Sequence, residues 1–198
     1  MTNRFEPFDP SPFDHQSQVV PGTLLVASPA LKGTAFSKTV VFVLQDNSEG
    51  TFGVVLNQPA NEKIKCAWHK LIGSDASDRF IVQGGPIGGP VFALHQQQNL
   101  AEMEMPGGVF VSAESDKFQQ LIDNDASSYR IVFGVAGWEG GQLREEIEAG
   151  LWFTLDGDAE QVFDDPTWMW EKSLRRYGQG LICDTIGIDQ LPSSPLLN

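Results

Sequence analysis

The sequence predicts a single α+β domain whose sheet is mixed or largely antiparallel. Apolar runs typical of strands come in groups of two and three between helix-like segments, whereas an α/β fold would alternate strands and helices singly. The length of 198 residues suits one domain, and 41% hydrophobic residues are enough for a packed core. The sequence contains no internal repeat, so we expect one compact body.

We expect this domain to span residues 21–180, between a flexible N-terminal tail at residues 1–20 and a C-terminal tail at residues 181–198. The first tail is rich in proline, and an acid directly follows each of its three phenylalanines, Phe5, Phe8 and Phe13. This composition is typical of a mobile end. The three Phe-acid pairs are also compatible with docking on a partner or folding back on the domain.

The first part of the domain reads as three strands and a helix. An apolar run over residues 23–27 predicts a buried strand that stops at Ser28-Pro29. Residues 40–44 and 52–56 predict a hairpin around a five- or six-residue loop. Apolar residues at helical spacing then predict a helix between an Asn61 cap and Gly73.

The middle of the domain predicts three more strands, at residues 80–82, 91–94 and 109–111. Residues 84–90 are expected to form the loop between the first two of them. Ser112 is of a residue type that caps helices, and the helical spacing that follows it predicts a second helix.

The last part predicts strands at residues 131–135 and 151–153, separated by a short helix that Gly150 closes. Asp165-Pro166 then opens a helix rich in tryptophan and methionine, which we expect to end near Tyr177-Gly178.

The charge is strongly acidic and unevenly distributed. The formal net charge is −13, and residues 99–171 carry all of it. Such a field repels phosphate backbones, so direct binding to nucleic acid is disfavoured. No stretch is long and apolar enough for a membrane helix, and the two cysteines, Cys66 and Cys183, lack a paired spacing. These observations predict a cytoplasmic protein that does not interact with membranes.

The loops contain the most unusual motifs. Residues 84–90 hold four glycines and two prolines, and include Gly84, Gly85 and Pro86. This spacing does not match a dinucleotide-binding loop, and a structural turn is favoured over a binding loop. Residues 137–142, with Trp138, Gly141 and Gln142, lie between a strand and a helix, where helix amides can receive an anion. The acids nearby favour a structural corner there too.

Side chains that would identify a reaction are not grouped in the sequence. The three histidines lack metal-ligand spacing, there is no serine nucleophile motif, and no cofactor is implied. Cys66 and His69 lie three residues apart among lysines, which leaves a reactive thiolate as a minor alternative.

Four segments in order resemble the AlgH/YqgE family of bacterial proteins: residues 22–31, residues 36–44 with 50–59, residues 83–86 running to 91–95, and residues 137–143. The resemblance covers about residues 22–178. It implies an α+β domain whose sheet curls into a pseudo-barrel flanked by helices, and it implies no defined reaction. Members are sometimes labelled transcriptional regulators. At Leu44-Gln45-Asp46 and at Gln58 this chain departs from the family's usual residues, so no role is carried over to those positions.

Three functional hypotheses follow. The first is a non-catalytic regulatory or adaptor domain that binds a protein or a small ligand. The second is an enzyme or small-metabolite binder, with a ligand-binding pocket formed by Asn57, the glycine-rich loops and His95. The third is a transcriptional regulator that acts without direct contact to DNA.

Overall fold

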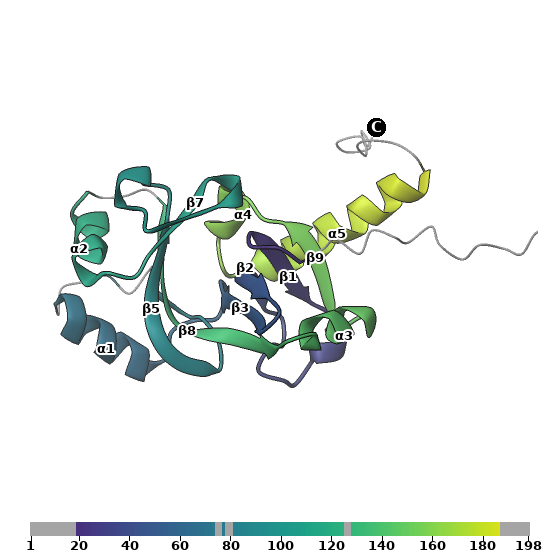
Figure 1. Cartoon of the computed structure of the whole chain (residues 1–198), viewed down its shortest axis with the longest axis horizontal. Helices are drawn as coiled ribbons and strands as arrows, with labels where there is room; N and C mark the ends of the chain where they lie inside the picture. The colour runs from purple at the N-terminus through teal and green to yellow at the C-terminus, as the bar shows by residue number, and fades with distance from the viewer. Residues whose placement is uncertain (1–18, 74–76, 78–80, 125–127, 187–198) are drawn as a thin grey trace, which may run out of the picture.

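The computed structural model describes residues 19–73, 77, 81–124 and 128–186. Most of the expected N-terminal tail and residues 187–198 of the expected C-terminal tail lie outside this part of the chain. Figure 1 shows a curled sheet with helices at both ends. None of the helices in these ranges combines the length and hydropathy needed to cross a bilayer.

The nine strands form one sheet in the order β6-β7-β5-β8-β3-β2-β1-β9, and the short strand β4 pairs with β8. The strands are β1 (Thr23–Ala27), β2 (Val40–Asn47), β3 (Gly50–Val55), β4 (Ile81–Gln83), β5 (Ile87–His95), β6 (Met103–Met105), β7 (Val109–Ser112), β8 (Tyr129–Glu139) and β9 (Trp152–Asp156). Among the strand pairs of the described residues, only β4–β8 is parallel. The sheet curls into a half-barrel, and the predicted fold class is confirmed.

In the part of the chain that the structure describes, five α-helices flank the sheet: α1 (Glu62–Ile72), α2 (Ser115–Asp123), α3 (Gln142–Glu148), α4 (Ala159–Val162) and α5 (Met169–Ile186). Three short 3-10 turns, η1 (Pro29–Leu31), η2 (Gln98–Leu100) and η3 (Pro106–Gly108), complete the elements. Helices α1 and α2 lie at one end of the molecule, and α3 and α5 at the other (Figure 1).

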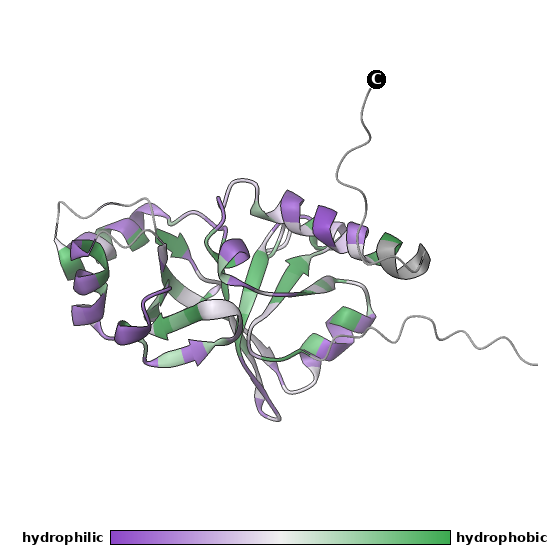
Figure 2. Cartoon of the chain, turned by 90° about the horizontal axis from the view of Figure 1, so that it is seen from above, coloured by the Kyte–Doolittle hydropathy of each residue, from purple (hydrophilic) through white to green (hydrophobic). Residues whose placement is uncertain are grey.

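Both faces of the central strands are buried. Leu24, Phe42 and Val54 occupy paired positions and belong to one apolar cluster, whereas their neighbours Leu25, Val41 and Val55 belong to a second. A strand that is covered on both faces has a continuous run of apolar residues, and the sequence shows such runs in β1, β2 and β3. In Figure 2 these strands are hydrophobic, while hydrophilic residues lie mainly on helices and loops.

A third cluster lies under α1 and α2, around Trp68, Phe118 and Ile131. The predicted α1 is confirmed, because the Asn61 side chain accepts hydrogen bonds from the amides of Lys63 and Ile64. Each end of the half-barrel therefore has its own apolar packing.

The loop of the β2–β3 hairpin is shorter than predicted. Asn47 pairs with Gly50, so only Ser48 and Glu49 form the turn. The Asn47 side chain accepts hydrogen bonds from the amides of Glu49 and Gly50 at 2.9 and 3.2 Å. Because a turn former can satisfy the backbone in this way, the strands continue into the cluster of polar residues.

The expected capping role of Ser112 is wrong. Ser112 is the buried last residue of β7, and its hydroxyl donates to the Leu100 carbonyl at 2.6 Å. The N-cap residue of α2 is Glu114, and the Glu102 carboxylate accepts from the amides of Ala113 and Glu114 just before the helix. Burial opposes the charge on Glu102, but Lys117 and these amides hold its pKa below the usual value.

Three other boundaries differ from expectation. Residues 84–90 are not all loop, because β5 already begins at Ile87 opposite Val135. Helix α5 begins at Met169 instead of Pro166 and continues through Gly178 to Ile186. Gly178 does not adopt the positive φ of a helix-terminating glycine, so it is tolerated inside the helix.

Candidate functional site

The first two glycines of the glycine-rich corner are used by the fold. Gly84 donates to the Phe133 carbonyl and accepts from the Val55 amide, both at 2.7 Å. A side chain at Gly84 would collide with Gly134, and one at Gly85 with the Val135 backbone. Close packing between strands therefore explains both residues. Pro86, by contrast, is exposed.

His95 lies inside the protein with both ring nitrogens engaged. Its Nδ1 accepts from the Gln97 amide at 3.2 Å, and its Nε2 lies 2.9 Å from the Ser112 hydroxyl. Since that hydroxyl donates to the Leu100 carbonyl, Nε2 carries the proton and the ring is neutral. Burial lowers the pKa of His95, which favours the same state.

Trp138 belongs to an aromatic cluster organised by one carboxylate. Glu146 Oε2 accepts from the indole nitrogens of Trp138 at 2.9 Å and Trp152 at 2.7 Å. Gln142 donates to the other oxygen at 2.8 Å, and Phe36 packs on both indoles. This cluster holds α3 against β8 and β9.

A groove of about 580 Å³, which we call the α3 groove, lies between the β2–β3 turn and α3. Gly141 is part of its wall. The buried side chains of Thr51 and Leu143 and the half-buried Ile147 contribute to its lining. Arg144 also borders it, and makes no ion pair with any residue in the described ranges. The other lining residues are Val19, Asp46, Asn47, Ser48 and Glu148.

A second cavity of about 330 Å³, the Lys38 cleft, contains Asn57. The Asn57 amide donates to the Lys38 carbonyl and its oxygen accepts from the Val40 amide, both at 2.9 Å. Lys38 has a φ of +58°, which is uncommon for a residue with a side chain. Its ammonium lies 3.6 Å from a Glu171 oxygen and 5.2 Å from the Trp170 ring centre.

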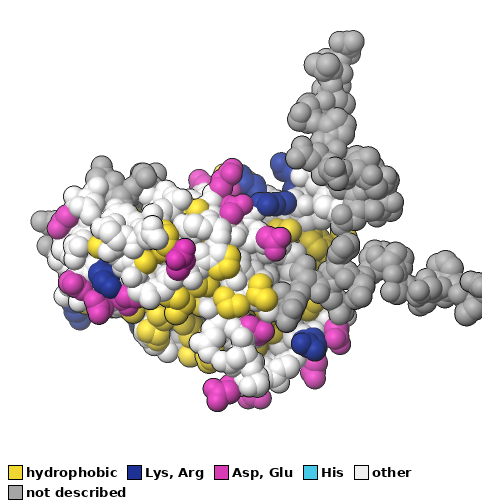
Figure 3. Space-filling view, turned by 45° about the horizontal axis from the view of Figure 1, so that its top comes forward, with side chains coloured by type: hydrophobic (Ala, Val, Ile, Leu, Met, Phe, Trp, Pro, Cys, Tyr) yellow, Lys and Arg dark blue, Asp and Glu magenta, His cyan; other side chains and the backbone are white. Residues whose placement is uncertain are grey.

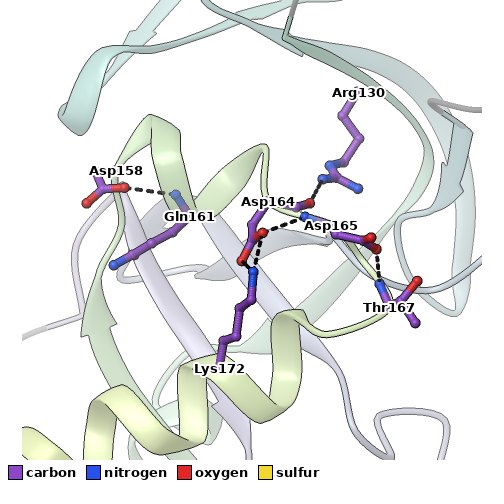
Figure 4. Close-up of polar contacts among 7 residues, drawn as sticks. All are labelled: Arg130, Asp158, Gln161, Asp164, Asp165, Thr167 and Lys172. Atoms are coloured by element: carbon purple, nitrogen blue, oxygen red, sulfur yellow. Dashed lines mark hydrogen bonds and ion pairs between the residues drawn. The ribbon is translucent and has the colours of Figure 1, made fainter. Parts of the chain in front are cut away.

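Arg130 fixes the segment that leads into this cleft (Figure 4). The buried guanidinium donates to the carbonyls of Leu56, Val162 and Asp164 at 2.8, 3.2 and 2.9 Å. Burial lowers its pKa to about 10, so the group stays charged at neutral pH. The Asp164 carboxylate binds Lys172 through both oxygens, at 2.7 and 2.8 Å.

The turn before α5 is held by Asp165. The Thr167 amide donates to the Asp165 carboxylate at 2.8 Å, and this bond lowers the pKa of Asp165. Pro166 and Thr167 line the Lys38 cleft. They are positioned by this bond and by the hydrogen bond from the Trp168 amide to the Asp165 carbonyl.

An apolar patch crosses β3, β8 and β5. Phe52 pairs with Gly137 and Ile87 with Val135, and paired residues share one face of a sheet. A side chain placed at Gly137 would touch both the Phe52 ring and Ile87, so the two lie side by side over bare backbone. Phe52 is 46% exposed and Ile87 is 47% exposed. We call these four residues the Phe52–Ile87 patch.

Figure 3 shows one face of the molecule on which hydrophobic side chains gather, with acidic side chains around them. Cys66 is exposed on α1.

The sequence-predicted ligand residues do not form one pocket. Asn57 lines the Lys38 cleft and Gly141 the α3 groove, while Gly84, Gly85, His95 and Trp138 lie in the interior. Arg130, Glu146 and Phe52 were not singled out by the sequence. Arg130 alone had a usable signal, because it is a lone cation in an apolar strand of an acidic region.

Comparison with known proteins agrees with the fold. A family model described as AlgH-like matches residues 24–181. A UPF0301 protein of Chlorobaculum tepidum is 34% identical, over 97% of this chain and 98% of its own length. Another, from Thermobifida fusca, is 33% identical over 89% of this chain and 94% of its own.

Solved structures show the same architecture. The solution structure of the AlgH protein from Pseudomonas aeruginosa aligns with a TM-score of 0.63 at 24% identity, over 89% of this chain and 99% of that one. A crystal structure of a Corynebacterium diphtheriae protein aligns with a TM-score of 0.62 at 22% identity, over 80% and 87%.

Proposed function

The chain belongs to the AlgH-like family, and on that premise we propose that it is a non-catalytic regulatory or adaptor domain that binds a protein partner. The single observation that carries the proposal is the Phe52–Ile87 patch. Two large apolar side chains lie there half exposed and side by side.

The patch lies on the face of the sheet that carries the apolar cluster of Leu24, Phe42 and Val54. Phe52 is two residues from Val54, so the two side chains point to the same face of β3. Completing the burial of Phe52 and Ile87 against a partner would contribute roughly 1 kcal/mol each. Apolar surface of this kind on a soluble domain is typical of a protein-binding site.

Gly88 and Gly89 support the same surface. Side chains at these positions would meet nothing within 4 Å, and neither residue has a positive φ, so the fold does not require glycine there. The pairing of β5 with β8 is interrupted between Ile87 and Val91, which leaves this backbone exposed. Bare backbone beside an apolar patch lets a partner approach closely.

The interactions of His95 and Glu146 favour binding over catalysis as the proposed function. The His95 ring is buried with both nitrogens engaged, and the Glu146 carboxylate is occupied by two indoles and Gln142. The acidic charge disfavours direct contact with DNA, so any regulatory role would act through proteins. The cytoplasm remains the location that we propose.

Affinity capture with matched variants tests this function. Phe52→Ser with Ile87→Ser should weaken binding of a stoichiometric partner on the order of 30-fold, from about 2 kcal/mol of lost apolar contact. Leu71→Ser with Met103→Ser is the control, because these residues are similarly exposed elsewhere. Equal capture by wild type and both double variants would rule out the patch as the binding surface.

A second candidate function is binding of a small carboxylate in the Lys38 cleft. The cleft combines a cation, an indole and an amide in a volume within the usual range for small ligands. A ligand that binds there should raise the melting temperature of the wild type but not of Lys38→Ala. Lys32→Ala, at an exposed lysine outside the cleft, is the control.

A further inference from the structure

Val19, the first residue that the structure describes, lies in the wall of the α3 groove. Val19 is half-buried, lines the groove, and packs on the same apolar cluster as Ile147 and Leu143. A turn in which the Thr23 amide donates to the Val20 carbonyl at 3.0 Å then carries the chain into β1. Residues that precede Val19 therefore start from the wall of this groove.

The groove has the chemistry to receive an aromatic ring beside a single carboxylate. Ile147 offers half-buried apolar surface beside the buried Leu143, and Arg144 is an exposed cation without an ion-pair partner among the residues placed by the structure. Asp46 and Glu148 also border the groove, and they would repel a ligand with several acids.

The sequence directly before Val19 contains such a pair. Phe13-Asp14 lies six residues before Val19, which corresponds to a reach of about 20 Å in extended chain. Helix α3 has seven residues and is therefore only about 10 Å long. Phe13 can therefore reach along the whole length of α3, and its covalent connection gives it a high effective concentration there.

We propose that the α3 groove is the docking site of the chain's own N-terminal segment, with the Phe13 ring on Ile147 and the Asp14 carboxylate on Arg144. This contact is separate from the Phe52–Ile87 patch and does not depend on the function proposed for it.

Methyl NMR of the full-length protein tests the proposal through the Ile147 side chain. Phe13→Ala should remove the ring-current shift of the Ile147 methyl groups, whereas Phe5→Ala, in the more distant Phe5-Glu6 pair, should leave it unchanged. Identical Ile147 signals in the wild type and both variants would overturn the proposal.

Charge reversal tests the ionic contact separately. Asp14→Arg and Arg144→Asp should each move the Ile147 signals toward those of Phe13→Ala, and the double variant should restore them. A double variant that remains like the single ones would refute the pairing.

Two further measurements identify the occupant. A peptide of residues 1–18, added to full-length Phe13→Ala, should return the Ile147 signals to their wild-type positions in a saturable manner. Wild-type signals that change on dilution would assign the segment to a second copy of the chain, and would overturn docking within one molecule.

Discussion

Removal of the Glu146 carboxylate should destabilise the protein more than removal of any neighbouring acidic side chain. Glu146→Ala leaves the indole N–H groups of Trp138 and Trp152 without their acceptor, and these residues are only 4% and 2% exposed. A buried donor without a partner costs about 1–3 kcal/mol, so two donors predict a loss of roughly 2–6 kcal/mol.

This loss should appear in thermal unfolding. For a protein of this size each kcal/mol corresponds to about 2–4 °C, so the melting temperature should fall by at least about 4 °C. Tryptophan fluorescence is a suitable probe, because two of the five tryptophans lie on the perturbed carboxylate. Glu146→Gln should lose less, since it retains a carbonyl acceptor.

Glu145→Ala is the matched control, as Glu145 is the preceding residue of the same helix and is exposed. The charge removed is equal, so a difference between the two variants reports the indole contacts. Equal melting temperatures for Glu145→Ala and Glu146→Ala would refute the reasoning, because the indoles would then be satisfied without Glu146.

Three other predictions concern buried groups. Arg130→Met removes the donor from three carbonyls and should reduce the free energy of unfolding by roughly 2–5 kcal/mol, as measured by urea denaturation; a change below about 1 kcal/mol would contradict the role assigned to the guanidinium. Since the pKa of His95 is lowered in the folded state, its contribution is fully present above the unfolded value of about 6.5 and is lost as the pH falls further. The loss of stability between about pH 6.5 and 5 should therefore be smaller in His95→Gln, and equal slopes would refute this. Gly84→Ala should destabilise the fold strongly whereas Gly89→Ala should not, because only the first would collide with its neighbours, and equal melting temperatures would contradict that distinction.

Local signals were sufficient for most of the elements. The Asn61 cap and the apolar spacing behind it predicted α1, and continuous apolar runs predicted β1, β2 and β3. Errors arose where a distant group replaced a local one. Ser112 is of a capping residue type, but α2 begins only at Ser115, and the amides just before it are bound by Glu102 from another segment.

The candidate surfaces were much harder to predict. The Phe52–Ile87 patch combines residues from strands that are 35 positions apart in sequence, and it depends on their registers with β8. Arg130 binds carbonyls of residues 56, 162 and 164, none of which shares a local pattern with it. Among 26 acids, no sequence feature distinguished Glu146 as the one that binds two indoles.

The sequence by itself determined the fold class, the family and the acidic character of this protein. Apolar periodicity and residue spacing are local properties, so they can be interpreted from the sequence without knowing how the segments pack. Only the tertiary structure decided which glycines are required by packing, which histidine and tryptophans are enclosed, and which apolar side chains remain exposed. Those properties depend on strand register and on contacts between distant segments, since one-residue changes in register exchange the two faces of a strand.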